Sequence, residues 1–185
     1  PVAACLASQY AGWKIQVGDF FAMGSGPMRA VYGKEALYDQ IGWREQPREL
    51  VGILESGTLP DLEIVNDICR KCDRSAECMT LIVARTASLA GGIQVVSRSV
   101  ETAMHKLHEL NFDLSHVVGA FGTAPLPPVA RDDLQAIGRT NDAVLYGAEV
   151  TLYVTGDDQA LAQVGQKLPS STSKDYGIPF SEIFK

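Results

Sequence analysis

The stretch ECMTLIVARTASLAGGIQVVSRSVETAMHKLHEL, residues 77–110, decides the fold class of this chain. Its first ten residues are mostly apolar, which is typical of a buried β-strand. After Gly91 and Gly92, apolar residues recur every three or four positions, which predicts an amphipathic helix. A strand followed by a helix is the repeating unit of α/β folds.

The same alternation continues along the chain and predicts an α/β architecture. Apolar runs predict strands at 13–23, 49–56 and 115–121. Helical spacing predicts helices at 28–40, at 60–74, near 131–137, and at 157–168 with Asp157 as the N-cap. Residues 138–156 are interpreted as two strands broken at Tyr146–Gly147. No boundary between domains is visible.

Composition excludes several classes of protein. The chain has 185 residues, 46% of them hydrophobic, which is enough for one large core or two small ones. Its net charge of −6 argues against a nucleic-acid partner, because binding phosphates needs a basic surface, and it is compatible with a cationic substrate. Since there is no long apolar run and no signal-peptide pattern, we expect no membrane span and a cytoplasmic location. The four cysteines are expected to be reduced thiols.

Both ends of the sequence predict that it was cut from a longer chain. It begins with PVAACLASQYAGW, without an initiator Met, and it stops at PFSEIFK, an amphipathic stretch with no closing signal. We therefore expect an internal fragment, incomplete at both termini, that is inactive by itself.

The predicted helix that ends at Leu110 has one polar face and one apolar face. The polar face contains Arg98, Glu101, His105 and His108. The apolar face contains Ile93, Val96, Val100, Met104, Leu107 and Leu110. An Arg and a Glu three positions apart usually form a weak ion pair in solvent. The alternative is an active site, and the residues alone leave both interpretations open.

The GSGP turn follows an apolar strand and precedes a helix. Ser25 is the predicted N-cap, and Pro27 the first helical residue. The backbone N–H groups of Gly24, Ser25 and Gly26 are therefore candidates for holding a phosphate or carboxylate. The turn lacks the lysine of a Walker loop and is not a full dinucleotide fingerprint, so a purely structural turn is the alternative.

The cysteines raise the possibility of a zinc site. Cys69 and Cys72 have ligand spacing, Cys78 is near in sequence, and His105 or His108 would complete the set. However, Cys69 and Cys72 lie within a helical pattern, where a cysteine is commonly a small buried hydrophobe. A zinc-dependent hydrolase is therefore kept as an alternative.

Four stretches together resemble one enzyme family. They are YAGWKIQVGDFFAMGSGPMRA (10–30), SRSVETAMHKLHEL (97–110), GRTNDAVLYGAEV (138–150) and KLPSSTSKDYGIPFSEIFK (167–185). In this order they are similar to methenyltetrahydromethanopterin cyclohydrolase, an enzyme of one-carbon metabolism in methanogenesis and methylotrophy. The resemblance implies a cytoplasmic homotrimer of two-domain α/β subunits that binds a pterin substrate between the domains, with no metal or separate cofactor.

The resemblance also implies roles for particular residues. The family's catalytic Arg-x-x-Glu pair matches Arg98 and Glu101. The residues expected to contact substrate are Gly24, Ser25, Gly26, Arg139, Thr140, Asn141 and Asp142. For the last four, a structural turn that enters a strand is the alternative. A non-catalytic pterin-binding module is the second alternative function, and it predicts binding without turnover.

Overall fold

The structure is a computed structural model that describes residues 1–10 and 12–183. Helices and strands alternate along the chain, which confirms the predicted α/β class. The chain divides into two compact units. Unit 1 contains Pro1–Leu6 and Thr86–Lys185, and unit 2 contains Ala7–Arg85. No helix among the described residues is long and apolar enough to cross a membrane.

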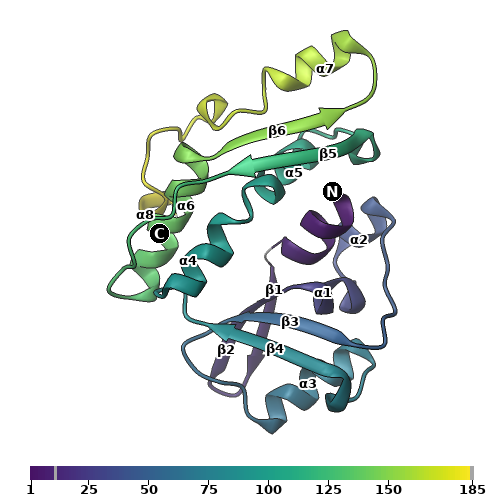
Figure 1. Cartoon of the computed structure of the whole chain (residues 1–185), viewed down its shortest axis with the longest axis vertical. Coiled ribbons are helices and arrows are strands. Elements are labelled where there is room, and N and C mark those ends of the chain that lie inside the picture. Colours follow the sequence, from purple (N-terminus) through teal and green to yellow (C-terminus); the bar gives the residue numbers. More distant parts are fainter. Residues whose placement is uncertain (11, 184–185) are drawn as a thin grey trace. The chain divides into compact units, whose positions relative to one another are not determined.

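Unit 2 is built on a four-stranded mixed sheet with the strands in sequence order (Figure 1). The strands are β1 (Trp13–Val17), β2 (Phe20–Ser25), β3 (Leu50–Glu55) and β4 (Met79–Ala84). The pairs β1–β2 and β2–β3 are antiparallel, whereas β3 and β4 are parallel. The strands predicted at 49–56 and 77–86 are thus confirmed.

Three helices complete unit 2: α1 (Pro27–Tyr32), α2 (Ala36–Ile41) and α3 (Leu62–Cys72). Residues of α1 and α3 share one core with the sheet, namely Met28, Ile64, Ile68 and Cys72 with Ile15, Leu50 and Leu54. Helix α3 begins where the Asp61 side chain accepts a hydrogen bond from the backbone N–H of Ile64, at 3.0 Å. Leu62, the first residue of this helix, is 71% exposed.

Two elements predicted as continuous are broken in unit 2. The strand expected at 13–23 is a hairpin, in which β1 and β2 pair through a two-residue turn at Gly18 and Asp19. Gly18 has φ 53°, a left-handed conformation that glycine adopts at low cost. The helix expected at 28–40 ends at Gly33, whose φ of 48° closes α1 before α2 begins.

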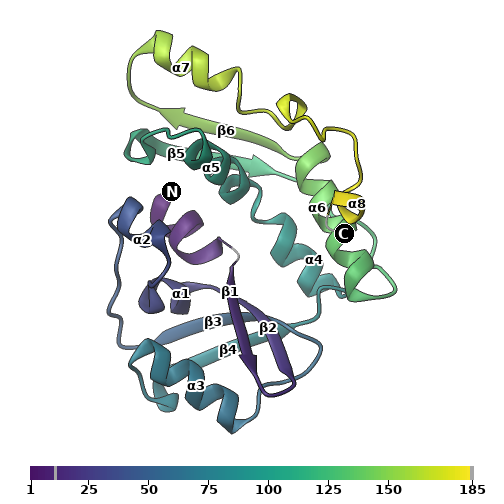
Figure 2. The same ribbon diagram turned by 180° about the vertical axis from the view of Figure 1, so that it is seen from behind.

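The described residues of unit 1 form five α-helices and a two-stranded antiparallel sheet. The helices are α4 (Leu89–Val96), α5 (Ser99–Glu109), α6 (Asp133–Gly147), α7 (Asp158–Gly165) and α8 (Phe180–Ile183), and the strands are β5 (Val117–Thr123) and β6 (Glu149–Val154). Helix α5 packs on β5 and β6, and α8 lies against α6, as Figure 2 shows from behind. The N-cap predicted at Asp157 is confirmed, since its side chain accepts from Ala160 N–H at 2.9 Å.

The prediction of two strands at 138–156 was wrong for its first half. Residues 133–147 form α6, and only Glu149–Val154 is a strand. Asp132 caps this helix by accepting from the backbone N–H of Gln135 at 2.9 Å, and its second carboxylate oxygen accepts from the Gln135 side-chain amide at 2.8 Å. This double acceptance at the N-cap stabilises the start of a helix.

Four short helical turns connect these elements: a π-type turn at Ala3–Ala7 and 3-10 turns at Ala76–Cys78, Leu114–His116 and Ser170–Thr172. The π-type turn carries the chain from unit 1 into unit 2, because the boundary between the units falls at Leu6 and Ala7.

Candidate functional site

Arg98 lies at a break between two helices rather than inside one. The helix predicted to run to Leu110 ends at Val96 and starts again at Ser99, with Arg98 as the N-cap of α5. The Arg98 backbone N–H donates to Val95 at 3.1 Å, and its carbonyl accepts from the backbone N–H of Thr102 at 2.9 Å. The Thr102 hydroxyl donates to the same carbonyl at 3.1 Å. These bonds fix the backbone of Arg98 at the start of α5.

Glu101 is the third residue of α5, and it is buried. Only 6% of the residue is exposed, although the predicted helix placed it on the polar face. Met104 and Leu107 are also buried, so α5 is covered on more than one side. The positive end of a helix stabilises a carboxylate in its first turn. The burial of Glu101 excludes the interpretation of this carboxylate as half of a fully solvated surface ion pair.

Cys5 belongs to the surroundings of Glu101. Burial raises the pKa of the Cys5 thiol, and the negative charge of Glu101 raises that pKa further. Both residues belong to unit 1, although they are distant in sequence. Sequence reasoning did not place Cys5 at the site, and no local motif connects it with Glu101.

His105 and His108 are both half-buried on α5. His105 Nε2 lies 3.4 Å from Glu109 Oε1, four residues along the same helix. Burial lowers the pKa of His105, which outweighs the opposite effect of Glu109. His105 thus has a local partner in Glu109.

The GSGP turn is buried in unit 2, and its glycines have packing reasons to be glycine. A Cβ at Gly24 would come within 2.7 Å of Ile15 Cδ1. Gly26, with φ 89°, is the N-cap of α1, so the prediction of Ser25 as the cap was wrong. Pro27 is the first helical residue, as predicted. The Gly26 N–H donates to the carbonyl of Ser8 at 2.6 Å, so the protein already occupies this donor.

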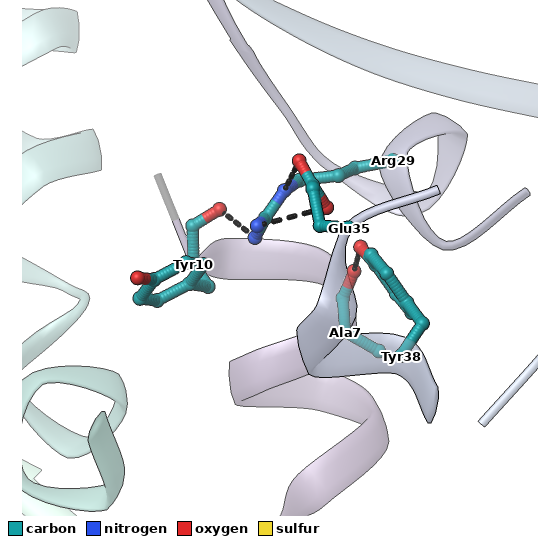
Figure 3. Close-up of polar contacts among 5 residues, drawn as sticks. All are labelled: Ala7, Tyr10, Arg29, Glu35 and Tyr38. Carbon is teal, nitrogen blue, oxygen red and sulfur yellow. Dashed lines mark hydrogen bonds and ion pairs between the residues drawn. The ribbon is translucent and has the colours of Figure 1, made fainter. Parts of the chain in front are cut away.

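A cluster around Arg29 holds the segment 7–10 onto α1 and α2 (Figure 3). The guanidinium of Arg29 is fully buried and makes two contacts with Glu35: Nε donates to Oε1 at 3.1 Å, and Nη2 lies 3.1 Å from Oε2. Its Nη1 donates to the Tyr10 carbonyl. The Tyr10 ring lies over the guanidinium at 4.5 Å, and the Tyr38 hydroxyl donates to the Ala7 carbonyl at 2.7 Å. These contacts give the cluster a structural role, because they tie the segment 7–10 to the two helices.

The residues of the GRTND stretch lie on helix α6, which corrects the alternative of a turn that enters a strand. Arg139 Nη1 donates to the carbonyls of Pro128 and Val129, both at 3.3 Å. Thr140 and Asn141 bond back to carbonyls of their own helix. Asp142 accepts from the backbone N–H of Phe180 at 2.8 Å, which fixes the start of α8. Of these four residues, Arg139 is the most exposed.

The cysteines are placed as small hydrophobes. Cys69 and Cys72 are buried on α3, where Cys69 Sγ lies 3.7 Å from Met79 Sδ and Cys72 Sγ lies 3.7 Å from the carbonyl of Met28. Burial raises the pKa of Cys72 to about 11, which disfavours the thiolate that zinc requires. No group of three or more metal-ligating side chains occurs in the part of the chain that the structure describes.

The sequence-predicted site residues therefore fall into three groups. Arg98 and Glu101 are together in the first turn of α5, and Arg139 to Asp142 lie on α6 of the same unit. Gly24 to Gly26 belong to unit 2. The geometry supplies a buried carboxylate beside a permanently charged arginine, which suits proton transfer next to a cationic substrate.

Comparison with known proteins gives one consistent result. The family described as "Cyclohydrolase (MCH)" matches residues 1–185. A methenyltetrahydromethanopterin cyclohydrolase from Rhodopirellula baltica is 52% identical over 190 residues, covering all of this chain and 57% of the relative. Proteins of the same name from Xanthobacter autotrophicus and Methylobacillus flagellatus are 48% and 46% identical, with 55% and 57% of the relative covered. The chain thus spans little more than half the length of these relatives.

Proposed function

The chain belongs to the cyclohydrolase (MCH) family, and from this premise we propose that its protein reversibly hydrolyses methenyl-tetrahydromethanopterin to 5-formyl-tetrahydromethanopterin. Relatives of that name, 43–52% identical over the whole of this chain, support the proposal. The protein would then be a hydrolase of one-carbon metabolism that opens a cyclic amidine C–N bond. The observation that carries the assignment to residues is the burial of Glu101 in the first turn of α5.

The proposed substrate has a cationic N–CH–N bridge whose carbon is already electrophilic. Water adds to this carbon, and a base must take a proton from the water as the C–O bond forms. Glu101 is the proposed base, since a carboxylate also attracts the cationic bridge. One C–N bond of the tetrahedral intermediate then breaks: protonated Glu101 returns its proton to the departing nitrogen, and the hydroxyl proton of the intermediate is released to solvent as the formyl C=O forms. No electron is transferred overall.

Arg98 is proposed to orient this carboxylate and to hydrogen-bond the substrate or its developing oxygen. Its guanidinium is planar, permanently charged and carries several donors, which an ammonium group does not reproduce. Its backbone is fixed at the N-cap of α5, three residues before Glu101. The pair therefore approaches the substrate from one helical turn.

We propose further contacts to the substrate from the remaining predicted residues. Arg139, Thr140, Asn141 and Asp142 are the proposed contacts for the pterin. For Arg139, the exposure of the residue supports a contact with the pterin. Gly24, Ser25 and Gly26 are the proposed contacts for the anionic tail of the substrate, and their place directly before α1 supports this proposal.

We also propose a cytoplasmic homotrimer that works without a metal ion or separate cofactor. The proposal about cofactors rests on the reaction, because an electrophilic cationic carbon needs neither a Lewis acid nor a redox partner to accept water. The proposal about assembly and location rests on the family resemblance. Elemental analysis and light scattering of the full-length protein test these two points.

The decisive experiment compares the full-length protein with Glu101→Gln, a substitution that keeps the shape of the side chain. Hydrolysis of methenyl-tetrahydromethanopterin is followed by loss of the methenyl chromophore. Removing a general base is expected to lower kcat by about 10²- to 10⁴-fold while substrate binding is retained. An inactive wild type would refute the function, whereas an unaffected variant would refute only the role of Glu101. Binding without turnover in the wild type would indicate a pterin-binding module.

A further inference from the structure

Unit 1 contains a cavity of about 670 Å³. Neither Arg98 nor Glu101 is among the described residues that line it. One wall is the side of α5 that carries Ser99, Thr102 and Ala103. The other walls come from the end of α6, from β6, and from the segment after α7. Apolar side chains dominate these walls: Val144, Leu145, Val150, Leu152, Leu168 and Phe180.

The cavity is open to solvent on one side, and a contiguous apolar surface of this kind is typical of a site where another group packs. Apolar walls without partner atoms lose dispersion contacts, and water inside such a space finds few hydrogen-bond partners. The volume suits either a small ligand or several side chains of a protein segment.

The polar groups favour a protein segment over a small ligand. Ligand sites present a few polar groups that converge on the bound molecule. Here His105 and Glu109 pair with each other at 3.4 Å, and the Glu109 side chain is 65% exposed, so this charge lies at the rim. An apolar centre with a charged rim is the anatomy of a protein–protein interface.

The rest of the unit also has too little covering for its apolar surface. Its sheet has two strands in the part of the chain that the structure describes, and α5 packs on it. Val118, Phe121 and Tyr153 are exposed by 62%, 62% and 58% on this sheet. The relatives carry much additional chain, because this sequence spans 57% and 55% of the first two.

We propose that the cavity is an intramolecular docking site for a segment of the full-length protein that lies outside the 185 residues. The segment inserts apolar side chains between α5, β6 and Phe180, and its polar flanks meet the rim at His105, Lys106 and Asp175. The cavity is then part of the core of the longer protein and is separate from the proposed reaction centre.

The test introduces Leu152→Cys into the full-length protein and measures the rate of modification by a small methanethiosulfonate reagent, with per-site detection by mass spectrometry. Val150→Cys is the second variant, in case the first does not fold. We expect at least 100-fold slower modification in the native than in the unfolded protein, at all protein concentrations and without added ligand. Rapid modification, or protection only with added substrate, would overturn the proposal.

A photo-crosslink then identifies the occupant. Benzoylphenylalanine replaces Phe180, whose aromatic ring it resembles, and the irradiated full-length protein is digested and sequenced. The expected product is an intramolecular crosslink to a peptide outside residues 1–185. A crosslink between two chains would show a second copy as the occupant, and a crosslink only within residues 1–185 would show a cavity without one. Either result would overturn the proposal.

Discussion

Arg29 is a fully buried cation, so the stability of its surroundings depends on the carboxylate that faces it. Glu35 makes two contacts of 3.1 Å with the guanidinium, and its side chain is 30% exposed. Glu35→Ala leaves the charge buried with the Tyr10 carbonyl and two aromatic rings. We expect the free energy of unfolding of the full-length protein to fall by about 2–4 kcal/mol, measured by urea denaturation.

Asp39→Ala is the matched control for this prediction. Asp39 pairs with Arg44 at 2.5 Å, and Arg44 also lies over the Tyr38 ring, at 5.6 Å. This pair is exposed, by 80% and 50%, so solvent replaces it at a cost of about 0–1 kcal/mol. Equal losses in the two variants would show that burial does not set the cost.

The Cys5 thiol reports on the charge of Glu101. Burial raises the Cys5 pKa above 9.0, and the Glu101 carboxylate raises it further. Glu101→Gln removes that negative charge, so we expect the Cys5 pKa to fall and its alkylation by iodoacetamide at pH 8.5 to become faster. Peptide mass spectrometry over a pH series measures the pKa. Cys72 in unit 2, whose pKa is raised to about 11, is the internal control and should not change. An unchanged Cys5 pKa would place Glu101 beyond electrostatic range of Cys5.

At the scale of elements, the start of α6 is stabilised by the N-cap Asp132, which accepts two hydrogen bonds from Gln135. Asp132→Ala removes the acceptor for the Gln135 N–H, and we expect a loss of about 1 kcal/mol in urea denaturation. Asp132→Asn keeps an acceptor oxygen in the same place and should lose only a few tenths of a kcal/mol. If both variants lost the same free energy, the carboxylate charge rather than the cap would stabilise α6.

The sequence predicted the elements whose signals are local. The runs at 49–56 and 77–86 are strands because continuous apolar residues are bounded by turn formers, and α7 begins where Asp157 caps it. The prediction failed at 138–156, where the AVLY run has strand composition but lies inside α6. The helix predicted near 131–137 does begin at the Asp132 cap, and it continues through this run to Gly147.

The sequence predicted that Arg98 and Glu101 lie one helical turn apart, but it did not predict which residues surround them. Arg98 and Glu101 share one helical turn, as their spacing indicates. The break at Ser97 and Arg98 has no glycine or proline to mark it, so the helical spacing predicts one continuous helix. The burial of Glu101 and the proximity of Cys5 depend on chain that is distant in sequence, which single-sequence periodicity does not detect.

At the scale of the whole molecule, the division into two units predicts that each loses protection against hydrogen exchange independently. Gly52→Ala on β3 places a Cβ against Met28 Sδ and 2.8 Å from Leu81 Cδ2 in unit 2. Gly122→Ala on β5 places one 2.7 Å from Ser99 Oγ and 2.9 Å from Val100 Cγ2 in unit 1. Such overpacking costs about 1–3 kcal/mol, or roughly a 5- to 150-fold loss of protection.

The two glycine variants are each other's control in the full-length protein. Gly52→Ala should accelerate amide exchange in β3, β4 and α3 and leave β5 and β6 unchanged, and Gly122→Ala should do the reverse. The reason is that each new Cβ strains contacts within one unit only. Equal acceleration of both units by either variant would show that they unfold together, and that one cooperative core, rather than two, holds the buried carboxylate of Glu101 in place.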